Sequence, residues 1–368
     1  MEIKMQRRHF NTYLTGLLLS TAFSGVSIAS TEPSYASASV DKEGQHWLVV
    51  FNSSAVEQMR YPLPSRAHQV IKHPKKSWVL VVARRPGQYL LVVDLTTGKL
   101  VKQLDVIQGQ DFCGHMQISQ NGCYLYTTEN TTLTSQGLVV VRDIHKQFRP
   151  VQQFSSGGIG PHQLKLSTDG NTMVVANGGI HTLDRVKLNL KSMQSNLSYI
   201  DLKTQKVTEQ VGLPQQQHAQ LSIRHIDVNN SDKTLIAMQY QGEMTDKVPL
   251  VAIHKRGQPL QFLTIPDQVF YQLKQYCGSA CFDRSGNTVA VSAPKGDKIL
   301  FWDLAKNRFL GSAKVRDGCG IAQDVTNTSF VVSSGRGKVY KIPANTLKKK
   351  LVLNHKLMQW DNHIALIS

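Results

Sequence analysis

Short apolar runs separated by polar turns recur along most of the chain. The clearest unit is His115-Met-Gln-Ile-Ser-Gln-Asn-Gly-Cys-Tyr-Leu-Tyr-Thr127, and His162-Gln-Leu-Lys-Leu-Ser-Thr-Asp-Gly-Asn-Thr-Met-Val-Val-Ala176 repeats its pattern. Each unit predicts two β-strands joined by a tight turn. A further copy of the unit starts at Ala280, and weaker copies start at Ile226 and Val70. The chain is therefore expected to be built from repeated β units.

A second element of the repeat follows each of these hairpins. It appears as Val92-Val-Asp-Leu-Thr-Thr-Gly-Lys99, Tyr199-Ile-Asp-Leu-Lys-Thr-Gln-Lys206 and Phe301-Trp-Asp-Leu-Ala-Lys-Asn-Arg308. The full unit recurs every 40 to 60 residues or so, which is typical of a four-stranded propeller blade. Six blades are predicted, at residues 66–105, 112–155, 159–212, 221–265, 275–316 and 318–353.

Two fragments remain outside these six blades. Strands are predicted at 47–51 and 59–63 near the start and at 360–367 near the end, and neither fragment makes a blade alone. Pairing of the C-terminal strand with the N-terminal ones would complete a seventh blade and remove the exposed sheet edges of an open array. The predicted fold is all-β, a single seven-bladed β-propeller over 39–368. Two separate β domains, the alternative, would leave the fragments unexplained.

The N-terminus has the features of a cleavable export signal. A basic start that includes Arg7 and Arg8 precedes a moderately apolar stretch at 13–28, and Ala36-Ser37-Ala38 offers a cleavage site. The paired arginines predict a twin-arginine-like signal over residues 1–38, with an ordinary secretory signal as the alternative. The predicted location is the periplasm, with no transmembrane segment left after cleavage.

The partner that a positively charged chain is expected to bind depends on whether the chain is exported. A formal net charge of +17 normally raises nucleic acid as a partner. The predicted signal carries three basic and two acidic residues, so nearly all of the excess belongs to the folded domain. An exported protein does not normally meet nucleic acid. The excess instead favours an anionic ligand, an anionic envelope surface, or an acidic envelope protein with a role in metal uptake or redox chemistry.

Five of the 13 histidines occur at the start of a predicted channel-lining strand. The first strand of each blade lines the channel, so these side chains are expected near one mouth of it. His115 and His162 differ by one residue in their distance from the turn, and such an offset can reverse the direction of a side chain in a strand. Imidazoles of this kind suit Fe, Cu or Zn, or the axial positions of haem. The metal candidates are His68, His115, His162, His225 and His363. The alternative is that they only stabilise the blades.

Loops after the second strand of each blade are expected on the same face. Arg84 and Arg85 are candidates to hold a carboxylate or phosphate group, and Glu129 is a candidate metal ligand or partner of those arginines. An insertion at about 181–196 predicts a flap over this face. The candidate ligand-binding residues are Arg84, Arg85, Glu129, Asn130, Asn177 and Gly178.

The cysteines and the absent motifs limit the chemistry. Cys277 and Cys319 start adjacent predicted channel strands, where they would form a disulfide or supply a soft ligand; Cys113, Cys123 and Cys281 have no predicted partner. The absence of a Cys-x-x-Cys-His motif excludes covalent attachment of c-type haem. No hydrolase or P-loop motif occurs. The sequence therefore favours a binding protein over an enzyme and identifies no catalytic residue.

Seven segments of the chain together form a distinctive set of motifs. The segments are Phe112-Cys-Gly-His115, Tyr126-Thr-Thr-Glu-Asn130, Ser156-Gly-Gly-Ile-Gly-Pro-His162, Val175-Ala-Asn-Gly-Gly-Ile180, Lys187-Leu-Asn-Leu190, Arg224-His225 and Trp360-Asp-Asn-His363. With these motifs the chain resembles the exported bacterial family called domain of unknown function 1513 over nearly the whole mature chain, although Cys113 stands where a Tyr is expected and Cys277 where a small residue is usual. The resemblance implies an exported seven-bladed propeller, often encoded beside imelysin-like iron-regulated proteins and di-haem peroxidase-like oxidoreductases.

These observations lead to one hypothesis and two alternatives. The hypothesis is a periplasmic propeller that binds a metal ion, or a metal-bearing or anionic ligand, on its histidine face and assists iron or copper handling in the envelope. The first alternative is a metal-dependent oxidoreductase or lyase that uses the same face, with Glu129 as the base. The second is a protein-interaction scaffold whose histidines are structural.

Overall fold

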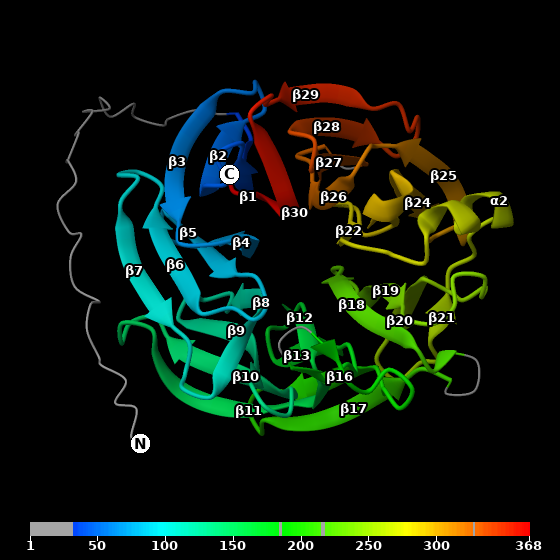
Figure 1. The fold of residues 1–368 in the computed structure, drawn as a ribbon, viewed down its shortest axis with the longest axis horizontal. Coiled ribbons are helices and arrows are strands. Elements are labelled where there is room, and N and C mark those ends of the chain that lie inside the picture. Colours follow the sequence, from blue (N-terminus) through cyan, green and yellow to red (C-terminus); the bar gives the residue numbers. More distant parts are fainter. Residues whose placement is uncertain (1–31, 184–185, 215–217, 327) are drawn as a thin grey trace, which may run out of the picture.

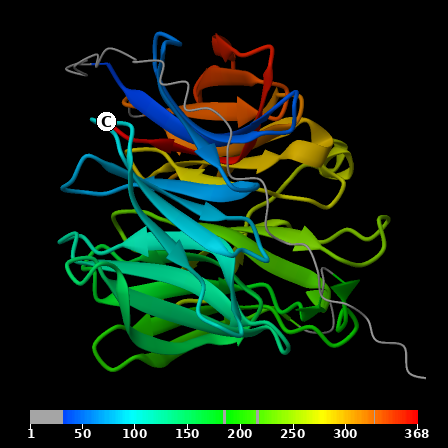
Figure 2. The same ribbon diagram turned by 60° about the vertical axis from the view of Figure 1, so that its left-hand side comes forward.

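Seven four-stranded antiparallel sheets surround a central axis in the described part of the chain (Figure 1). This computed structural model describes residues 32–368, with 184–185, 215–217 and 327 excepted. Neighbouring sheets pack face to face around the ring, as the rotated view also shows (Figure 2). The all-β seven-bladed β-propeller is therefore confirmed.

Six of the sheets follow the chain order of the predicted repeat, with the first strand innermost. They are β4 (Ala67–Lys72), β5 (Trp78–Ala83), β6 (Tyr89–Asp94) and β7 (Leu100–Asp105); β8 (Gln110–Ile118), β9 (Tyr124–Thr131), β10 (Gln136–Asp143) and β11 (Arg149–Ile159); β12 (Pro161–Leu166), β13 (Thr172–Asn177), β16 (Asn196–Asp201) and β17 (Lys206–Gly212); β18 (Leu221–Val228), β19 (Lys233–Tyr240), β20 (Val251–Lys255) and β21 (Gln261–Phe262); β22 (Ala280–Phe282), β23 (Thr288–Ala293), β24 (Lys298–Asp303) and β25 (Arg308–Lys314); and β26 (Gly318–Gln323), β27 (Ser329–Ser334), β28 (Lys338–Pro343) and β29 (Lys350–Asn354).

The seventh sheet joins the two ends of the chain. Its innermost strand is the C-terminal β30 (Met358–Leu366), which pairs with β1 (Ser34–Asp41), followed outward by β2 (His46–Asn52) and β3 (Glu57–Leu63). The innermost strands contact one another in a closed cycle, in the order β4, β8, β12, β18, β22, β26 and β30. The predicted closure of the ring by the two ends is thus confirmed.

Strand β1 corrects the predicted boundary between signal and domain. The boundary at residue 38 falls inside β1, where Ala36 and Ala38 are buried and Ser37 Oγ donates a hydrogen bond to the carbonyl of His363 at 2.7 Å. Small residues also suit a closely packed strand, which explains why the sequence pattern matched a cleavage site. The folded domain therefore includes all of β1, from Ser34 onward. The rest of the predicted signal lies outside the described residues.

Apolar cores lie between neighbouring blades. Because successive residues of a strand point to opposite faces, Val50 and Phe51 of β2 serve different cores. Val50 belongs to a cluster with Val81 of the first blade, and Phe51 to a cluster with Trp360 and Val331 of β27. Each blade therefore contributes to two interfaces, which holds the ring rigid around its channel.

Little of the described chain lies outside the seven sheets. A short hairpin, β14 (Thr182–Leu183) with β15 (Val186–Lys187), occupies the insertion between β13 and β16. The helical turns are α2 (Asp267–Phe270), η1 (Tyr271–Leu273) and η2 (Pro294–Gly296). No helix among the described residues is long and apolar enough to cross a membrane.

Candidate functional site

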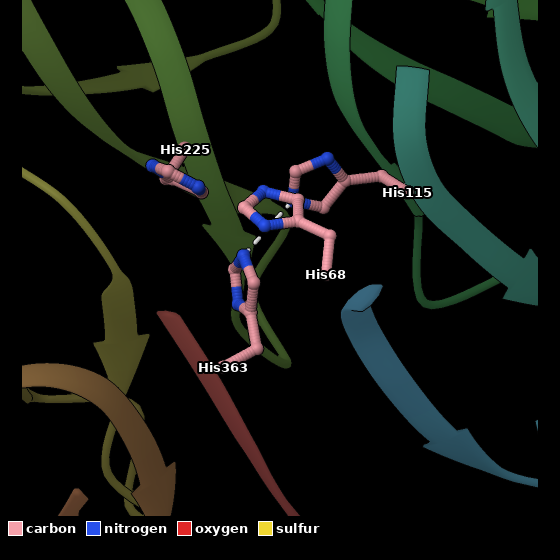
Figure 3. Close-up of side chains that lie close together, drawn as sticks. All are labelled: His68, His115, His225 and His363. Atoms are coloured by element: carbon pink, nitrogen blue, oxygen red, sulfur yellow. Dashed lines mark hydrogen bonds between the residues drawn. The ribbon is translucent and has the colours of Figure 1, made fainter. Parts of the chain in front are cut away.

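The five predicted histidines meet at the centre of the propeller. Each comes from the innermost strand of a different blade, and each is buried. Taken in chain order, neighbouring imidazole centroids lie 4.5 to 5.0 Å apart, and the cycle closes between the last histidine and the first. Figure 3 shows four of the rings. We call this set the histidine ring; its members are His68, His115, His162, His225 and His363.

A β-bulge in each inner strand explains why all five rings face the axis. The strand register shifts at or beside every ring histidine, in β4, β8, β12, β18 and in the pairing of β30 with β1. A bulge re-aims a side chain by adding one residue to one strand. The offset between His115 and His162, which predicted that one of them could turn away, is absorbed by these bulges.

Gly114 shows how tightly the bulge beside His115 is built. Its φ is +93°, in the region that favours glycine. A Cβ at this position would lie 2.8 Å from Cδ2 of His68. Glycine in the Cys113-Gly114-His115 segment is therefore required for two ring histidines from adjacent blades to approach each other.

The ring histidines are held in their neutral form. Burial is the first cause that lowers the pKa of all five imidazoles, and repulsion between the rings lowers the pKa of His115 further. Two direct contacts require this form: Nε2 of His115 lies 3.1 Å from Nε2 of His363, and the same atoms of His162 and His225 are also 3.1 Å apart. One nitrogen of each pair must lack a proton to accept the bond. A neutral imidazole is the state that binds metal.

Several buried ring nitrogens have no hydrogen-bond partner. Both nitrogens of His68 and Nδ1 of His115 and His162 are unpartnered. Buried polar atoms are nearly always hydrogen-bonded, so such a group calls for a ligand. One ligand nitrogen from each of four rings lies within 4.8 Å of the others; the four are His68, His115, His225 and His363. Tetrahedral Zn–N bonds of about 2.0–2.1 Å place nitrogens about 3.4 Å apart. Small rotations of the imidazoles would therefore bring the four nitrogens to the spacing of a tetrahedral metal site.

One carboxylate lies beside the ring. Asp361 Oδ1 is 3.9 Å from Nδ1 of His68, and Arg66 donates two hydrogen bonds to the same carboxylate, at 2.5 and 3.2 Å. Burial alone raises the pKa of Asp361, but His68 and Arg66 hold it below the usual range. A carboxylate behind a ligating histidine orients the ring and raises its basicity. Asp361 can therefore orient His68.

A cationic pocket opens next to the ring. Its volume is about 390 Å³, and His68, His162 and His225 form part of its wall. Four cationic side chains line it against a single carboxylate, that of Asp111. The cations are Arg84, Arg85, Lys187 and Arg224. We call this cavity the cationic pocket.

The structure places the predicted ligand-binding residues in two groups. Arg84, Arg85 and Asn130 line the cationic pocket, and Leu183 and Lys187 of the β14–β15 hairpin cover part of it, as the predicted flap requires. Glu129, Asn177 and Gly178 do not line it. Three of the six candidates are therefore at the pocket.

Glu129 is a structural residue of its blade. Strand alternation turns it away from the side of Asn130. Its Oε1 accepts hydrogen bonds from Arg142 Nη1 at 2.7 Å and from Thr127 Oγ1 at 2.6 Å, and it is fully buried. The structure therefore pairs Glu129 with Arg142 rather than with Arg84 or Arg85, and places it outside both the four-histidine group and the cationic pocket.

Asn177 and Gly178 also serve the scaffold. The Asn177 amide donates to the carbonyl of Ser156 at 2.9 Å, and its oxygen accepts from Ser156 Oγ at 2.6 Å, which joins β13 to β11. Gly178 packs against Ser222, and a Cβ there would lie 2.9 Å from its Oγ and 3.4 Å from Nη1 of Arg224. Both residues were predicted near the histidine face, but neither Asn177 nor Gly178 lines the cationic pocket.

Two site residues lie within two positions of the predicted histidines in sequence. Arg224 precedes His225, and Asp361 is two positions before His363. Both belong to motifs noted in the sequence, but neither is among the predicted site residues. Simple strand alternation gave no signal for either residue, because the bulges at His225 and at 361–363 set the direction of these side chains.

A second cavity lies on the other side of the ring. It measures about 290 Å³, has His363 in its wall, and is lined by residues that come after the ring histidines along the inner strands, such as Gln69 and Gln163. Lys165 and Asp227 form an ion pair of 2.8 Å within this wall. The histidine ring therefore separates two chambers of the central channel.

The cysteines do not contribute to the ring. All five are free, so the disulfide considered for Cys277 and Cys319 is absent. Burial raises the pKa of Cys113 and of Cys277 to about 12, which keeps both thiols protonated. Among the described residues, the group of potential metal ligands contains only histidines.

Comparisons with known proteins support the fold and identify one family. A family model described as "Protein of unknown function (DUF1513)" matches residues 61–367. A comparison with curated proteins finds no match. Among solved structures, the chain is similar to Kuenenia stuttgartiensis hydrazine synthase, with a TM-score of 0.64, 12% identity, and coverage of 89% of this chain and 99% of that chain. A functionally unknown protein from Desulfotomaculum acetoxidans gives a TM-score of 0.61 and 12% identity over 92% of this chain and 99% of that chain. At this identity, the likeness concerns the fold alone.

Proposed function

This chain belongs to the DUF1513 family of proteins of unknown function, and for it we propose the binding of a transition-metal ion by the histidine ring. The observation that carries the proposal is the group of four buried imidazoles whose ligand nitrogens lie within 4.8 Å of one another. A set of four neutral nitrogen donors suits Zn, Cu or Fe rather than Mg or Ca. The ring is thus a binding centre for a borderline metal.

The ring has the features of a prepared ligand set. Its imidazoles are neutral before any metal arrives, because burial disfavours their protonation. Four inner strands from different blades hold the ligating side chains, which gives a rigid scaffold of the kind that metal sites require. The proposed metal therefore does not need to organise the fold in order to bind.

The cellular role is inferred from the sequence rather than from the ring. The N-terminal pattern with Arg7 and Arg8 supports export to the periplasm. The family resemblance supports an accessory role in iron or copper handling in the envelope, with metal-uptake or redox proteins as partners. The protein on this proposal receives or holds a metal ion, or a ligand that carries one, without turning over a substrate.

Metal analysis tests the proposal. The protein is purified from its native envelope fraction without a chelator, and its metals are measured by mass spectrometry. The expected result is one Fe, Cu or Zn per chain, lost from a His115→Gln variant and retained in a His73→Gln variant. His73 is buried outside the ring and bonds the Gly122 carbonyl, so it is a matched control.

One observation favours the scaffold alternative. The two Nε2 contacts, His115 with His363 and His162 with His225, give each of these four imidazoles one hydrogen bond without any metal. On that alternative the purified protein carries no metal, and Zn²⁺, Cu²⁺ and Fe²⁺ all fail to bind to the chelator-treated chain in a titration. That result would falsify the proposed function.

A further inference from the structure

The cationic pocket holds more positive charge than its single carboxylate can balance. Arg85, Lys187 and Arg224 line it together with Asp111, whose carboxylate accepts a hydrogen bond from Gln88 Nε2 at 2.6 Å. A further cation, Lys295, has its Nζ 4.6 Å from the ring centroid of Tyr276, a residue that lines the pocket. Like charges gathered in a partly buried cavity repel one another strongly.

Two of the guanidinium groups have a buried donor nitrogen with no partner among the described residues. Nη1 of Arg85 and Nε of Arg224 are buried without a hydrogen-bond partner, although each is a strong donor. Buried arginine donors are normally paired, so an acceptor that carries negative charge would complete this wall.

The neighbouring histidine ring makes the imbalance larger. Four neutral imidazoles would leave the full charge of a bound metal ion uncompensated, and Asp361 is already shared with Arg66. The pocket and the ring share His68, His162 and His225, so a ligand in the pocket reaches the metal position directly. An anion in the pocket would offset the positive charge of both the metal ion and the arginine side chains.

The pocket favours an extended anion over a compact one. A volume of about 390 Å³ is within the range of small-molecule sites. Arg85 follows β5 and Arg224 lies in β18, so the two unpartnered guanidinium groups approach from different blades. Each planar guanidinium suits one carboxylate group. A ligand with two or more carboxylates can meet both groups and still offer an oxygen to the metal.

We propose that the cationic pocket binds a small polycarboxylate whose oxygens also coordinate the metal in the histidine ring, so that the protein takes up a metal–polycarboxylate chelate. The coordination of a metal by the bound polycarboxylate rests on the proposed function. The binding of the polycarboxylate itself is argued from the cationic pocket alone. No bond is made or broken apart from metal coordination.

Calorimetric titration of the full exported chain tests the proposal. The probe is tricarballylate, a tricarboxylate without the hydroxyl group that makes citrate a strong chelator, and inorganic phosphate is the comparison anion. The metal-free chain is expected to bind tricarballylate more tightly than phosphate, and loading with Zn²⁺ is expected to strengthen the binding of tricarballylate. Added salt should weaken both.

Substitutions distinguish anion binding by the cationic pocket from metal binding by the histidine ring. Arg224→Gln, with Arg85→Gln as a second variant, is expected to weaken tricarballylate binding about tenfold or more, since a charged partner is lost. Arg308→Gln makes the same charge change on the exposed outer strand β25 and is expected to leave binding unchanged. His115 does not line the cationic pocket, so His115→Gln should abolish only the increase in tricarballylate affinity that Zn²⁺ produces.

The outcomes distinguish the two proposals. If Zn²⁺ binds to the ring but tricarballylate binds to neither form of the chain, the polycarboxylate proposal is wrong and the proposed function stands. Equal affinity for phosphate would overturn the assignment to carboxylates, and equal tricarballylate affinity with and without Zn²⁺ would overturn the chelate. If no metal binds, the proposed function fails with the chelate, while the metal-free titration still decides the anion site.

Discussion

Nε2 of His115 lies 3.1 Å from Nε2 of His363, although 248 positions separate these residues in the chain. His115 is on β8 of the second blade, and His363 is on β30, the strand that closes the ring against β1. The candidate metal site therefore exists only when the two ends of the chain are joined. Fold closure and site assembly are one event in this propeller.

The members of the histidine ring are expected to contribute unequally to metal binding. His115 belongs to the group of four whose ligand atoms lie within 4.8 Å, and His162 does not. Loss of an outer partner typically costs about 10- to 100-fold in metal affinity. His115→Gln should exceed that loss, whereas His162→Gln should stay within it and keep one metal per chain. Competition titration with a chromogenic chelator measures both; equal losses would contradict the four-histidine site.

Glu129 is expected to contribute to stability and not to ligand binding. Its pair with Arg142 is buried on both sides, at 0% and 2% side-chain exposure. Removal of one partner of such a pair costs about 3–5 kcal/mol, because an unpaired charge stays buried. Glu129→Ala should therefore lower the free energy of unfolding by that amount in urea. The double variant Glu129→Ala with Arg142→Met should recover part of the loss. A Glu129→Gln chain with unchanged stability but no metal binding would show that this assignment is wrong.

The joint between the sixth and seventh blades is expected to weaken in acid. Asp324 Oδ1 accepts a hydrogen bond from the hydroxyl of Tyr35 at 3.1 Å, and Oδ2 pairs with Lys341 at 2.5 Å. Burial alone would raise the pKa of Asp324, but the bond from Lys341 and that from Thr326 lower it below 3.8. The stabilisation is therefore present above about pH 3.8 and is lost as the pH falls through the lower folded-state pKa.

Substitution of Asp324 checks this pH dependence. Asp324→Asn should reduce the free energy of unfolding by about 1.5 to 3 kcal/mol at pH 7, the value of a hydrogen bond to a charged group. The difference from the unmodified chain should shrink below pH 3.8. Asp303→Asn removes an exposed pair with Lys306 and should have little effect at any pH. A deficit that is the same at pH 7 and pH 3 would contradict the argument.

If the chain is exported as proposed, its signal is expected to be cleaved before Ser34. Cleavage after Ala38 would remove Tyr35, which is 1% exposed, together with the Ser37 hydroxyl that bonds the His363 carbonyl. Ser27-Ile28-Ala29 offers an earlier site with small residues in the same two positions. On this proposal, mass spectrometry of the protein from the envelope fraction should find an N-terminus at Ser30. A recombinant chain over 30–368 should fold, and one over 39–368 should not; a stable shorter chain would show that β1 is dispensable.

The strand pattern and the number of blades are determined by the sequence itself. Alternation, turn residues and hairpin motifs are local properties, so all six predicted blades match observed sheets within a few residues at most boundaries. The largest difference is the start of the fifth blade, where β22 begins at Ala280 and helical turns occupy 267–273. Closure of the propeller by 360–367 was also predictable from the number of strands, because the strands at the two ends of the chain had no other partners. Only β1 was missed, since its small residues also match a cleavage signal.

The direction of each side chain depends on the tertiary structure. Glu129 and Asn130 are adjacent in sequence, yet one lies inside its blade with Arg142 and the other lines the cationic pocket. The five histidines were predicted at one mouth of the channel, but only the bulges turn all of them to the axis. A bulge arises from how one strand packs against its neighbours, which a repeat pattern does not encode. The sequence by itself therefore determined which residues reach the channel, and packing around the closed ring decided which of them meet.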